Sequence, residues 1–220
     1  MVHPRVLSLD LDDTLWPVEP VIAAAEAELL AWLRHRCPRA ADIEVMRALR
    51  ATVAAQFPER SHDLTFLRRH ALGMQLLEAG YDEIHADAAF EVFYAARNRV
   101  SFYPDVHTAL ARLGKRHRLF ALSNGNADLE RCGIAHFFAG HISARDAGAA
   151  KPDARIFAAL AAHAGVAPAD VVHVGDDPLA DVVGARAAGM QAVWLNRSGR
   201  EWPSQWPPPD RTVKSLDELA

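Results

Sequence analysis

Short apolar runs occur near the start of the chain and throughout its second half, and each predicts a buried β-strand. Between the later runs lie longer stretches with a helical pattern. Strands that alternate with helices predict an α/β fold, with a three-layer, doubly wound, Rossmann-like core around a parallel sheet. The predicted strands cover 6–10, 119–123, 141–143, 171–175 and 191–195, and the predicted helices of this part cover 105–117, 127–132, 152–164 and 179–188.

The stretch from about residue 18 to residue 99 is helical in pattern and contains no strand pattern. Good helix formers such as Ala, Glu and Leu fill it, and proline or glycine separates its segments. We therefore predict two domains, a catalytic core at 1–16 and 104–220 and an inserted, all-helical cap at 17–103. The predicted cap helices cover 21–36, 43–57, 64–79 and 84–99.

Polar side chains gather where the predicted strands end. The carboxyl ends of parallel strands meet at one edge of a sheet, and doubly wound domains bind their ligands there. We therefore expect these side chains to form one site. They are Asp10, Asp12 and Thr14 after the first strand, Ser123 and Asn124 at the second, Asp176, Asp177 and Asp181 after the fourth, and Lys151 before a helix.

Phosphoryl transfer requires the groups that meet at this edge. Asp10, Asp12 and Asp176 offer hard oxygen ligands that suit Mg²⁺ rather than Zn²⁺. Asp10 can attack phosphorus while the metal shields its charge. Phosphoryl oxygens can accept hydrogen bonds from Ser123, from the backbone at Asn124 and beyond, and from Lys151. Each motif alone is most often a turn, a cap or a helix start, but the ordered set favours a catalytic site.

The motifs resemble those of a known superfamily. LDLDDTL at 9–15, LSNG at 122–125, Lys151 with its proline, and HVGDD at 173–177 followed by Asp181 are similar to the four ordered motifs of the haloacid dehalogenase superfamily. The resemblance covers the core from end to end. The helical insertion resembles the cap that one subfamily carries between its first two motifs.

The resemblance implies a role for each residue. Asp10 would be the nucleophile, and Asp12 the general acid/base that Thr14 helps to orient. Ser123, Asn124 and Lys151 would bind the phosphoryl group. Mg²⁺ would bind Asp10, the Asp12 main-chain carbonyl and Asp176. Asp181 would act through water or orient Lys151. Asp177 could have the same supporting role, and the sequence does not decide between the two residues.

Asp12 also bears on the reaction class, because the namesake dehalogenases attack carbon, need no metal and lack an acid at that position. The resemblance therefore implies a Mg²⁺-dependent phosphatase. Two alternatives remain open. A sugar phosphomutase shares the core but needs cap residues that hold a bisphosphate, and a non-catalytic binding module needs none of the catalytic groups.

A narrower resemblance concerns the substrate. EPVI at 19–22, SHDLT at 61–65, NGNA at 124–127 and GMQA at 189–192 are similar to a bacterial branch of the superfamily. That branch removes phosphate from 5-amino-6-(5-phospho-D-ribitylamino)uracil, an intermediate of riboflavin synthesis, or from flavin mononucleotide (FMN).

The resemblance implies a small phosphorylated metabolite as the partner, and composition argues against larger anionic partners. The formal net charge of the 220 residues is −4, which argues against binding to nucleic acid or an anionic membrane. Two cysteines without a CxxC pair favour a reducing cytoplasm.

Several other residues keep two interpretations. Four arginines of the predicted cap are most simply interpreted as members of ion pairs or of a solvated helix face, and contact with an anionic substrate is the alternative. They are Arg68, Arg69, Arg97 and Arg99. His173 lies in a predicted buried strand, which favours a structural role in the core. Trp16 either lines the site or packs as a core aromatic residue.

Overall fold

The computed structural model describes residues 6–219 and divides them into two compact units. The core unit consists of the described residues of Met1–Pro17, Ser101–Gly125 and Gly133–Ala220, and the helical unit consists of Val18–Val100 and Asn126–Cys132. Val18–Val100 lies inside the insertion predicted at 17–103. The structure groups Asn126–Cys132 with the helical unit, whereas the sequence analysis assigned this segment to the core.

The core unit is built on a six-stranded parallel sheet with the order β3-β2-β1-β4-β5-β6. The order reverses between β1 and β4, where a doubly wound sheet opens its ligand-binding crevice. The five predicted strands are confirmed, and β6 was missed because only Val213 of its three residues is buried. The strands are β1 (Val6–Leu9), β2 (Arg118–Ser123), β3 (Gly140–Ser143), β4 (Val171–Gly175), β5 (Gln191–Leu195) and β6 (Arg211–Val213).

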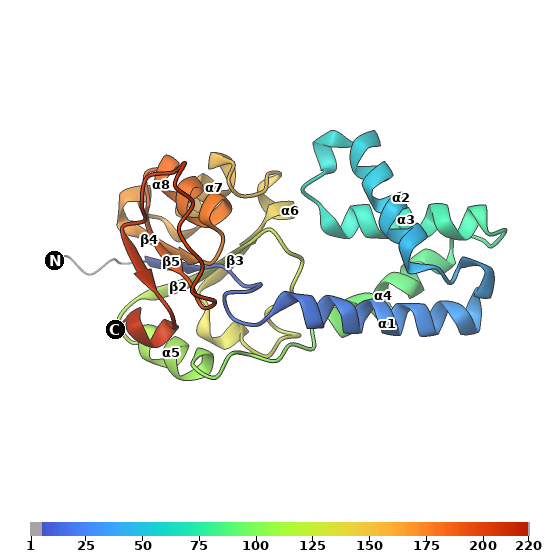
Figure 1. Cartoon of the computed structure of the whole chain (residues 1–220), viewed down its shortest axis with the longest axis horizontal. Helices are drawn as coiled ribbons and strands as arrows, with labels where there is room; N and C mark the ends of the chain where they lie inside the picture. The colour runs from blue at the N-terminus through green and yellow to red at the C-terminus, as the bar shows by residue number, and fades with distance from the viewer. Residues whose placement is uncertain (1–5, 220) are drawn as a thin grey trace. The chain divides into compact units, whose positions relative to one another are not determined.

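Helices cover both faces of this sheet, as Figure 1 shows, with α7 and α8 on one face and α5 on the other. Phe157 and Leu160 of α7 pack with Phe120 of the sheet in one apolar cluster. The predicted three-layer α/β core is thus confirmed. Its helices are α5 (Val106–Leu113), α6 (Ala144–Ala147), α7 (Ala154–Ala164), the π-helix η5 (Pro178–Val183), α8 (Gly184–Ala187), and the 3₁₀ turns η3 (Ala135–Phe137), η4 (Pro168–Asp170) and η6 (Leu216–Leu219).

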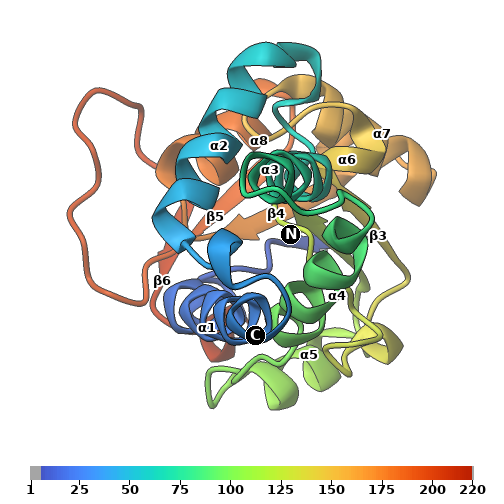
Figure 2. The ribbon, with the colours of Figure 1, turned by 90° about the vertical axis from the view of Figure 1, so that its right-hand side faces the viewer.

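Four long helices form the helical unit, and none of its described residues lies in a strand. Helix α1 packs on α4, and α3 packs on both α2 and α4; Figure 2 views α1 and α3 almost end-on. Leu29 and Leu33 of α1 meet Leu72 of α3 and Phe93 of α4 in the apolar interior. The elements are α1 (Val18–Arg36), α2 (Ile43–Gln56), α3 (Leu64–Glu78), α4 (His85–Arg97) and the 3₁₀ turns η1 (Pro38–Ala40) and η2 (Pro58–Arg60).

The helix predicted over 127–132 does not form, and turns replace it. The Asp128 carboxylate accepts hydrogen bonds from the backbone N–H groups of Glu130 and Arg131, at 2.9 and 3.1 Å. Short carboxylate side chains compete in this way with helical hydrogen bonding. The Asn98 side chain at the end of α4 accepts from Asp128 N at 2.7 Å, which ties the segment into the helical unit.

Among residues 6–219, no helix is long and apolar enough to cross a membrane.

Candidate active site

The predicted site residues meet at the carboxyl ends of β1, β2 and β4. Asp10 directly follows β1, and its backbone N–H donates to Val174 of β4 at 2.9 Å, which extends the ladder across the switch point. Its side chain is almost entirely buried. The parallel register therefore fixes this carboxylate in place at the crevice of the sheet.

Lys151 occupies the centre of the site. Its ammonium group donates to Asp10 Oδ1 at 2.5 Å, to Asp181 Oδ1 at 2.6 Å and to the Leu122 carbonyl at 2.9 Å. A lysine has three N–H donors, so the protein itself engages all of them. Although burial opposes the charge, the Asp10 and Asp181 carboxylates raise the pKa of Lys151, which is therefore cationic.

Asn124 holds the backbone of Lys151 rather than presenting its amide to a ligand. Its Oδ1 accepts from Lys151 N at 2.7 Å, and its Nδ2 donates to the Lys151 carbonyl at 2.9 Å. Neighbouring Ser123 is buried, and its Oγ accepts from Gly125 N at 2.9 Å. The hydroxyl hydrogen of Ser123 and the backbone N–H of Asn124 are the groups at this strand end that suit a phosphoryl oxygen.

Asp181 is the ionised partner of Lys151. Its Oδ1 also lies 3.1 Å from His173 Nε2, and its Oδ2 accepts from Asp177 N at 2.9 Å. Burial would raise the pKa of Asp181, but the Lys151 ammonium and His173 hold it below its ordinary range. Asp181 is thus the closer supporting residue, since the Asp177 carboxylate is exposed and caps η5 by accepting from Leu179 N and Ala180 N.

His173 is a core histidine, as the sequence favoured. Burial lowers its pKa, so the ring is neutral. Its Nδ1 lies 3.0 Å from Ser8 Oγ. We assign the proton to Nε2, which then donates to the Asp181 carboxylate while Nδ1 accepts from Ser8.

The site carries more negative than positive charge. Burial raises the pKa of Asp10 well above its usual range, and Lys151 offsets only part of this effect because the Asp181 and Asp12 carboxylates lie nearby. Burial also raises the pKa of Asp176 to about 7, with further contributions from Asp181 and Asp13 against the opposing Arg200. One more cation near Asp10 and Asp176 would balance these carboxylates.

The donor set fits a divalent ion with oxygen ligands. Within residues 6–219, carboxylate oxygens of Asp10, Asp176 and Asp181 lie within 4.8 Å of one another. Both oxygens of Asp181 are already engaged by Lys151, His173 and Asp177 N, so Asp10 and Asp176 are the better ligands. Carboxylates supplemented by water are the usual ligands of Mg²⁺.

Asp12 has a partner that the sequence did not reveal. Trp16 Nε1 donates to Asp12 Oδ1 at 2.8 Å. Thr14 was predicted to orient Asp12, but its buried Oγ1 has no hydrogen-bond partner among the described residues. The tight turn at 12–16 brings Trp16 back toward Asp12, and motif spacing does not reveal this consequence of loop geometry.

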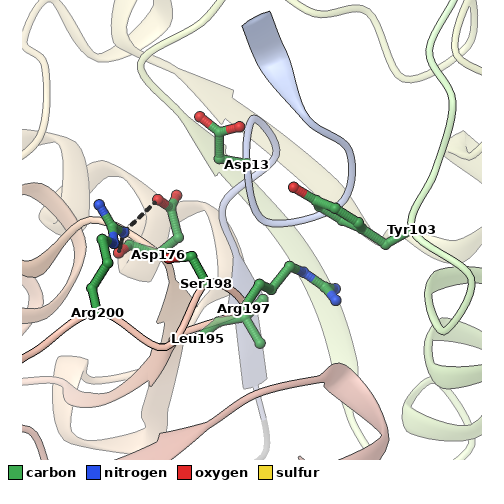
Figure 3. A pocket seen from close by; sticks show the side chains of 7 residues that line it. All are labelled: Asp13, Tyr103, Asp176, Leu195, Arg197, Ser198 and Arg200. Atoms are coloured by element: carbon green, nitrogen blue, oxygen red, sulfur yellow. Dashed lines mark hydrogen bonds and ion pairs between the residues drawn. The ribbon is translucent and has the colours of Figure 1, made fainter. Parts of the chain in front are cut away.

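A second missed group is Arg200, in the loop after β5. Its Nη2 donates to the Asp176 carbonyl at 3.0 Å and lies 3.3 Å from Asp176 Oδ2 (Figure 3). The Asn196 side chain braces the loop through both the N–H and the carbonyl of Arg200. Asp176 and Arg200 border a pocket of about 230 Å³, which is lined by Asp13, Tyr103, Asp176, Leu195, Arg197, Ser198 and Arg200.

The four arginines whose role the sequence left open have mainly structural surroundings. Arg68 is buried 3.7 Å from Glu26 and stacks on Phe93. Arg97 is 1% exposed. The pairs Arg69–Asp87 and Arg99–Glu28 are surface ion pairs within the unit. These contacts favour the ion-pair interpretation over contact with substrate.

The fold and the carboxylate–lysine site place this protein among hydrolases whose core is a doubly wound, parallel sheet. More narrowly, the chain belongs to the haloacid dehalogenase-like hydrolase family, whose model matches residues 4–189.

Three relatives illustrate the range of activities assigned to similar chains. The 5-amino-6-(5-phospho-D-ribitylamino)uracil phosphatase YigB of Escherichia coli (strain K12) is 32% identical over 91% of this chain and 87% of its own length. A phosphoserine phosphatase of Thermus thermophilus is 37% identical over 99% and 82%. A crystal structure described as a 2-haloacid dehalogenase from Pseudomonas syringae pv. Tomato DC3000 is 38% identical, has a TM-score of 0.93 and covers 98% of this chain and 96% of its own.

Proposed function

We propose that this protein is a Mg²⁺-dependent phosphate-monoester hydrolase that acts through an aspartyl-phosphate on Asp10. The observation that carries the proposal is the crowding of the Asp10 and Asp176 carboxylates beside a single ammonium group, Lys151. That arrangement suits a divalent cation and, with it, an anionic phosphoryl group.

The proposed reaction has two steps, formation of the aspartyl-phosphate and its hydrolysis. Asp10 Oδ attacks phosphorus, the bond to the leaving oxygen breaks, and Asp12 gives that oxygen its proton. Water then attacks phosphorus, Asp12 takes a proton from the water, the bond between phosphorus and Asp10 breaks, and inorganic phosphate leaves. Lys151 neutralises charge throughout, while Ser123 and the backbone N–H of Asn124 donate to phosphoryl oxygens. Bound Mg²⁺ would supply charge neutralisation between nucleophile and phosphate.

Dehalogenation of a 2-haloacid is the second candidate, because a structure 38% identical to this chain is described as a 2-haloacid dehalogenase. A halide leaves as a stable anion and needs no proton, whereas the leaving oxygen of a phosphate ester does. Asp12, held by Trp16, supplies the acid that only the phosphatase reaction needs. The metal-compatible pair of Asp10 and Asp176 points the same way.

For the substrate we propose 5-amino-6-(5-phospho-D-ribitylamino)uracil, with flavin mononucleotide as a chemically related alternative. The likeness to the Escherichia coli phosphatase of that name spans 91% of the chain and supports this choice. Phosphoserine is the competing substrate, since the Thermus thermophilus relative bears that name. In each case the partner is a small phosphorylated metabolite.

The test measures phosphate and halide release by the same preparation. We expect phosphate release from 4-nitrophenyl phosphate, with turnover that EDTA abolishes and Mg²⁺ restores, and no halide release from 2-chloropropionate. The panel then adds the ribitylaminouracil phosphate, flavin mononucleotide and phosphoserine. Asp12→Asn should lower kcat by about 10²–10⁴-fold, and Asp10→Asn by at least as much.

Each alternative has its own signature. Halide release without phosphate release would identify a dehalogenase. Phosphate transfer only in the presence of a sugar bisphosphate would identify a phosphomutase. A folded protein that binds phosphorylated ligands without turnover would be a binding module, and an Asp10→Asn variant with a tenth of wild-type activity would exclude the aspartyl-phosphate route.

A further inference from the structure

The turn that follows β1 places an indole N–H against the Asp12 carboxylate. Trp16 is fully buried, yet its one polar atom, Nε1, reaches Asp12 Oδ1 at 2.8 Å. A buried indole N–H needs an acceptor. Asp12 itself is only partly buried, so the contact joins a fixed ring to a carboxylate that is partly exposed.

Backbone contacts make this geometry rigid. Asp13 N donates to the Trp16 carbonyl at 2.7 Å, and Leu15 N donates to the Leu11 carbonyl at 2.7 Å. Asp13 adopts a left-handed conformation with φ 57°, which lets the chain reverse within so few residues. The Trp16 ring is further fixed by an edge contact with Phe102, with centroids 5.6 Å apart.

The indole also restricts where Asp12 can carry a proton. An indole N–H donates and never accepts. A protonated carboxyl oxygen is a poor acceptor, so whenever Asp12 carries the proton that it donates, the contact keeps Oδ1 toward Trp16 and leaves that proton on Oδ2. The proton for the leaving oxygen is thereby placed on one defined atom.

We propose that Trp16 is a positioning residue for the acid/base Asp12, an inference that rests on the proposed phosphatase function. In the first step the bond from Asp10 to phosphorus forms, the ester P–O bond breaks, and the Asp12 Oδ2 proton moves to the departing oxygen. Trp16 is fully buried, so it acts through Asp12. Its contribution is the orientation of Asp12 during this proton transfer.

This role predicts a dependence on the leaving group that simple structural damage does not produce. A poor leaving group such as phenolate needs the proton, whereas 2,4-dinitrophenolate departs without one. The ratio kcat/KM reports the steps up to departure of the leaving group, so it isolates the acid role of Asp12 from its later role as a base.

The experiment compares Trp16→Phe with wild type on phenyl phosphate and 2,4-dinitrophenyl phosphate. Phenylalanine keeps an aromatic ring beside Phe102 but removes the N–H. We expect kcat/KM for phenyl phosphate to fall about tenfold, the change that 1.4 kcal/mol produces, and kcat/KM for the dinitrophenyl ester to change less than about twofold.

Trp202→Phe is the matched control. It also removes an indole N–H, which donates to the Trp206 carbonyl at 3.1 Å, and it lies outside the turn at 12–16. We expect it to leave the ratio of the two activities unchanged. If Trp16→Phe folds poorly, replacement of Trp16 by benzothienylalanine keeps the ring shape with sulfur in place of N–H and provides the same comparison.

The possible outcomes separate the two hypotheses. Equal losses on both esters, or no loss on either, would overturn the positioning role while the phosphatase stands. A wild-type protein that hydrolyses neither ester with Mg²⁺ would overturn the proposed function, and the role of Trp16 with it.

Discussion

Gly175 is the residue on which the assembly of the site depends most closely. It ends β4, and a Cβ added there would lie 2.6 Å from the Asp181 Cβ and still closer to the Asp181 carboxylate. Only glycine lets Asp181 approach the strand end and reach Lys151 at 2.6 Å.

We therefore expect Gly175→Ala to displace Asp181, lower the free energy of unfolding by about 1–3 kcal/mol and reduce phosphatase kcat at least tenfold. Urea unfolding and the 4-nitrophenyl phosphate assay measure the two effects. Gly73→Ala, inside α3, is the control. A Cβ added at Gly73 would meet nothing nearer than Glu83 Cβ, at 4.0 Å. It should stabilise by about 0.5–1 kcal/mol. Equal effects of the two substitutions would contradict the steric argument.

The site residues could be predicted from the sequence where the backbone alone determines the position of a side chain. The apolar patterns of the strands before Asp10 and Asp181, and of the helix after Lys151, are plain in the sequence. The structure brings these three residues together. The partners of Asn124 and Asp12 were not predictable, because they depend on side-chain direction within tight turns. The amide of Asn124 faces the Lys151 backbone, and Trp16 takes the contact expected of Thr14.

At the scale of elements, one arginine connects four segments of the core unit. Arg197, after β5, makes two hydrogen bonds at 3.1 Å with the Asp105 carboxylate at the start of α5. It also donates to the Thr14 carbonyl at 3.1 Å, and Asp105 accepts from Leu216 N of η6 at 2.7 Å. The side chains of the pair are only 16% and 10% exposed, so loss of one partner leaves a largely buried charge.

We expect Arg197→Ala to lower the free energy of unfolding by about 2–4 kcal/mol, measured by urea denaturation. Arg155→Ala provides the matched control, since its pair with Asp153 is well exposed and its loss should change the free energy of unfolding far less. Similar losses for the two variants would show that the Arg197 pair is no stronger than a surface ion pair.

Element prediction succeeded where the pattern is long and failed where tertiary contacts decide. The four helices of the helical unit and the five longer strands follow from periodicity. The segment 126–132 does not, because its conformation depends on Asn98 and Thr65, which lie 30 and 61 residues away from their partners in the sequence. Strand β6 is too short and too exposed to leave an apolar signature.

At the scale of the whole molecule, the buried carboxylates of the site lower the stability of the core unit. Asp176 is largely buried, and burial with the Asp181 and Asp13 carboxylates raises its pKa to about 7, so its ionised form is costly without a compensating cation. Arg200 offsets part of this cost from one side. Concentrated functional charge of this kind commonly trades stability for activity.

We therefore expect Asp176→Asn to change stability in opposite directions with and without Mg²⁺. Without the ion, the neutral amide removes repulsion near Asp10 and should raise the free energy of unfolding by about 1–2 kcal/mol. With millimolar Mg²⁺, wild type should gain stability by mass action while the variant gains little, because a binding carboxylate is gone. Calorimetric scans with Mg²⁺ and with EDTA measure both effects, and Asp177→Asn, whose carboxylate caps η5 outside the acidic cluster, controls for a change of net charge. A wild-type midpoint that Mg²⁺ leaves unchanged, or a variant that Mg²⁺ stabilises as strongly as wild type, would show that Asp176 does not bind the ion.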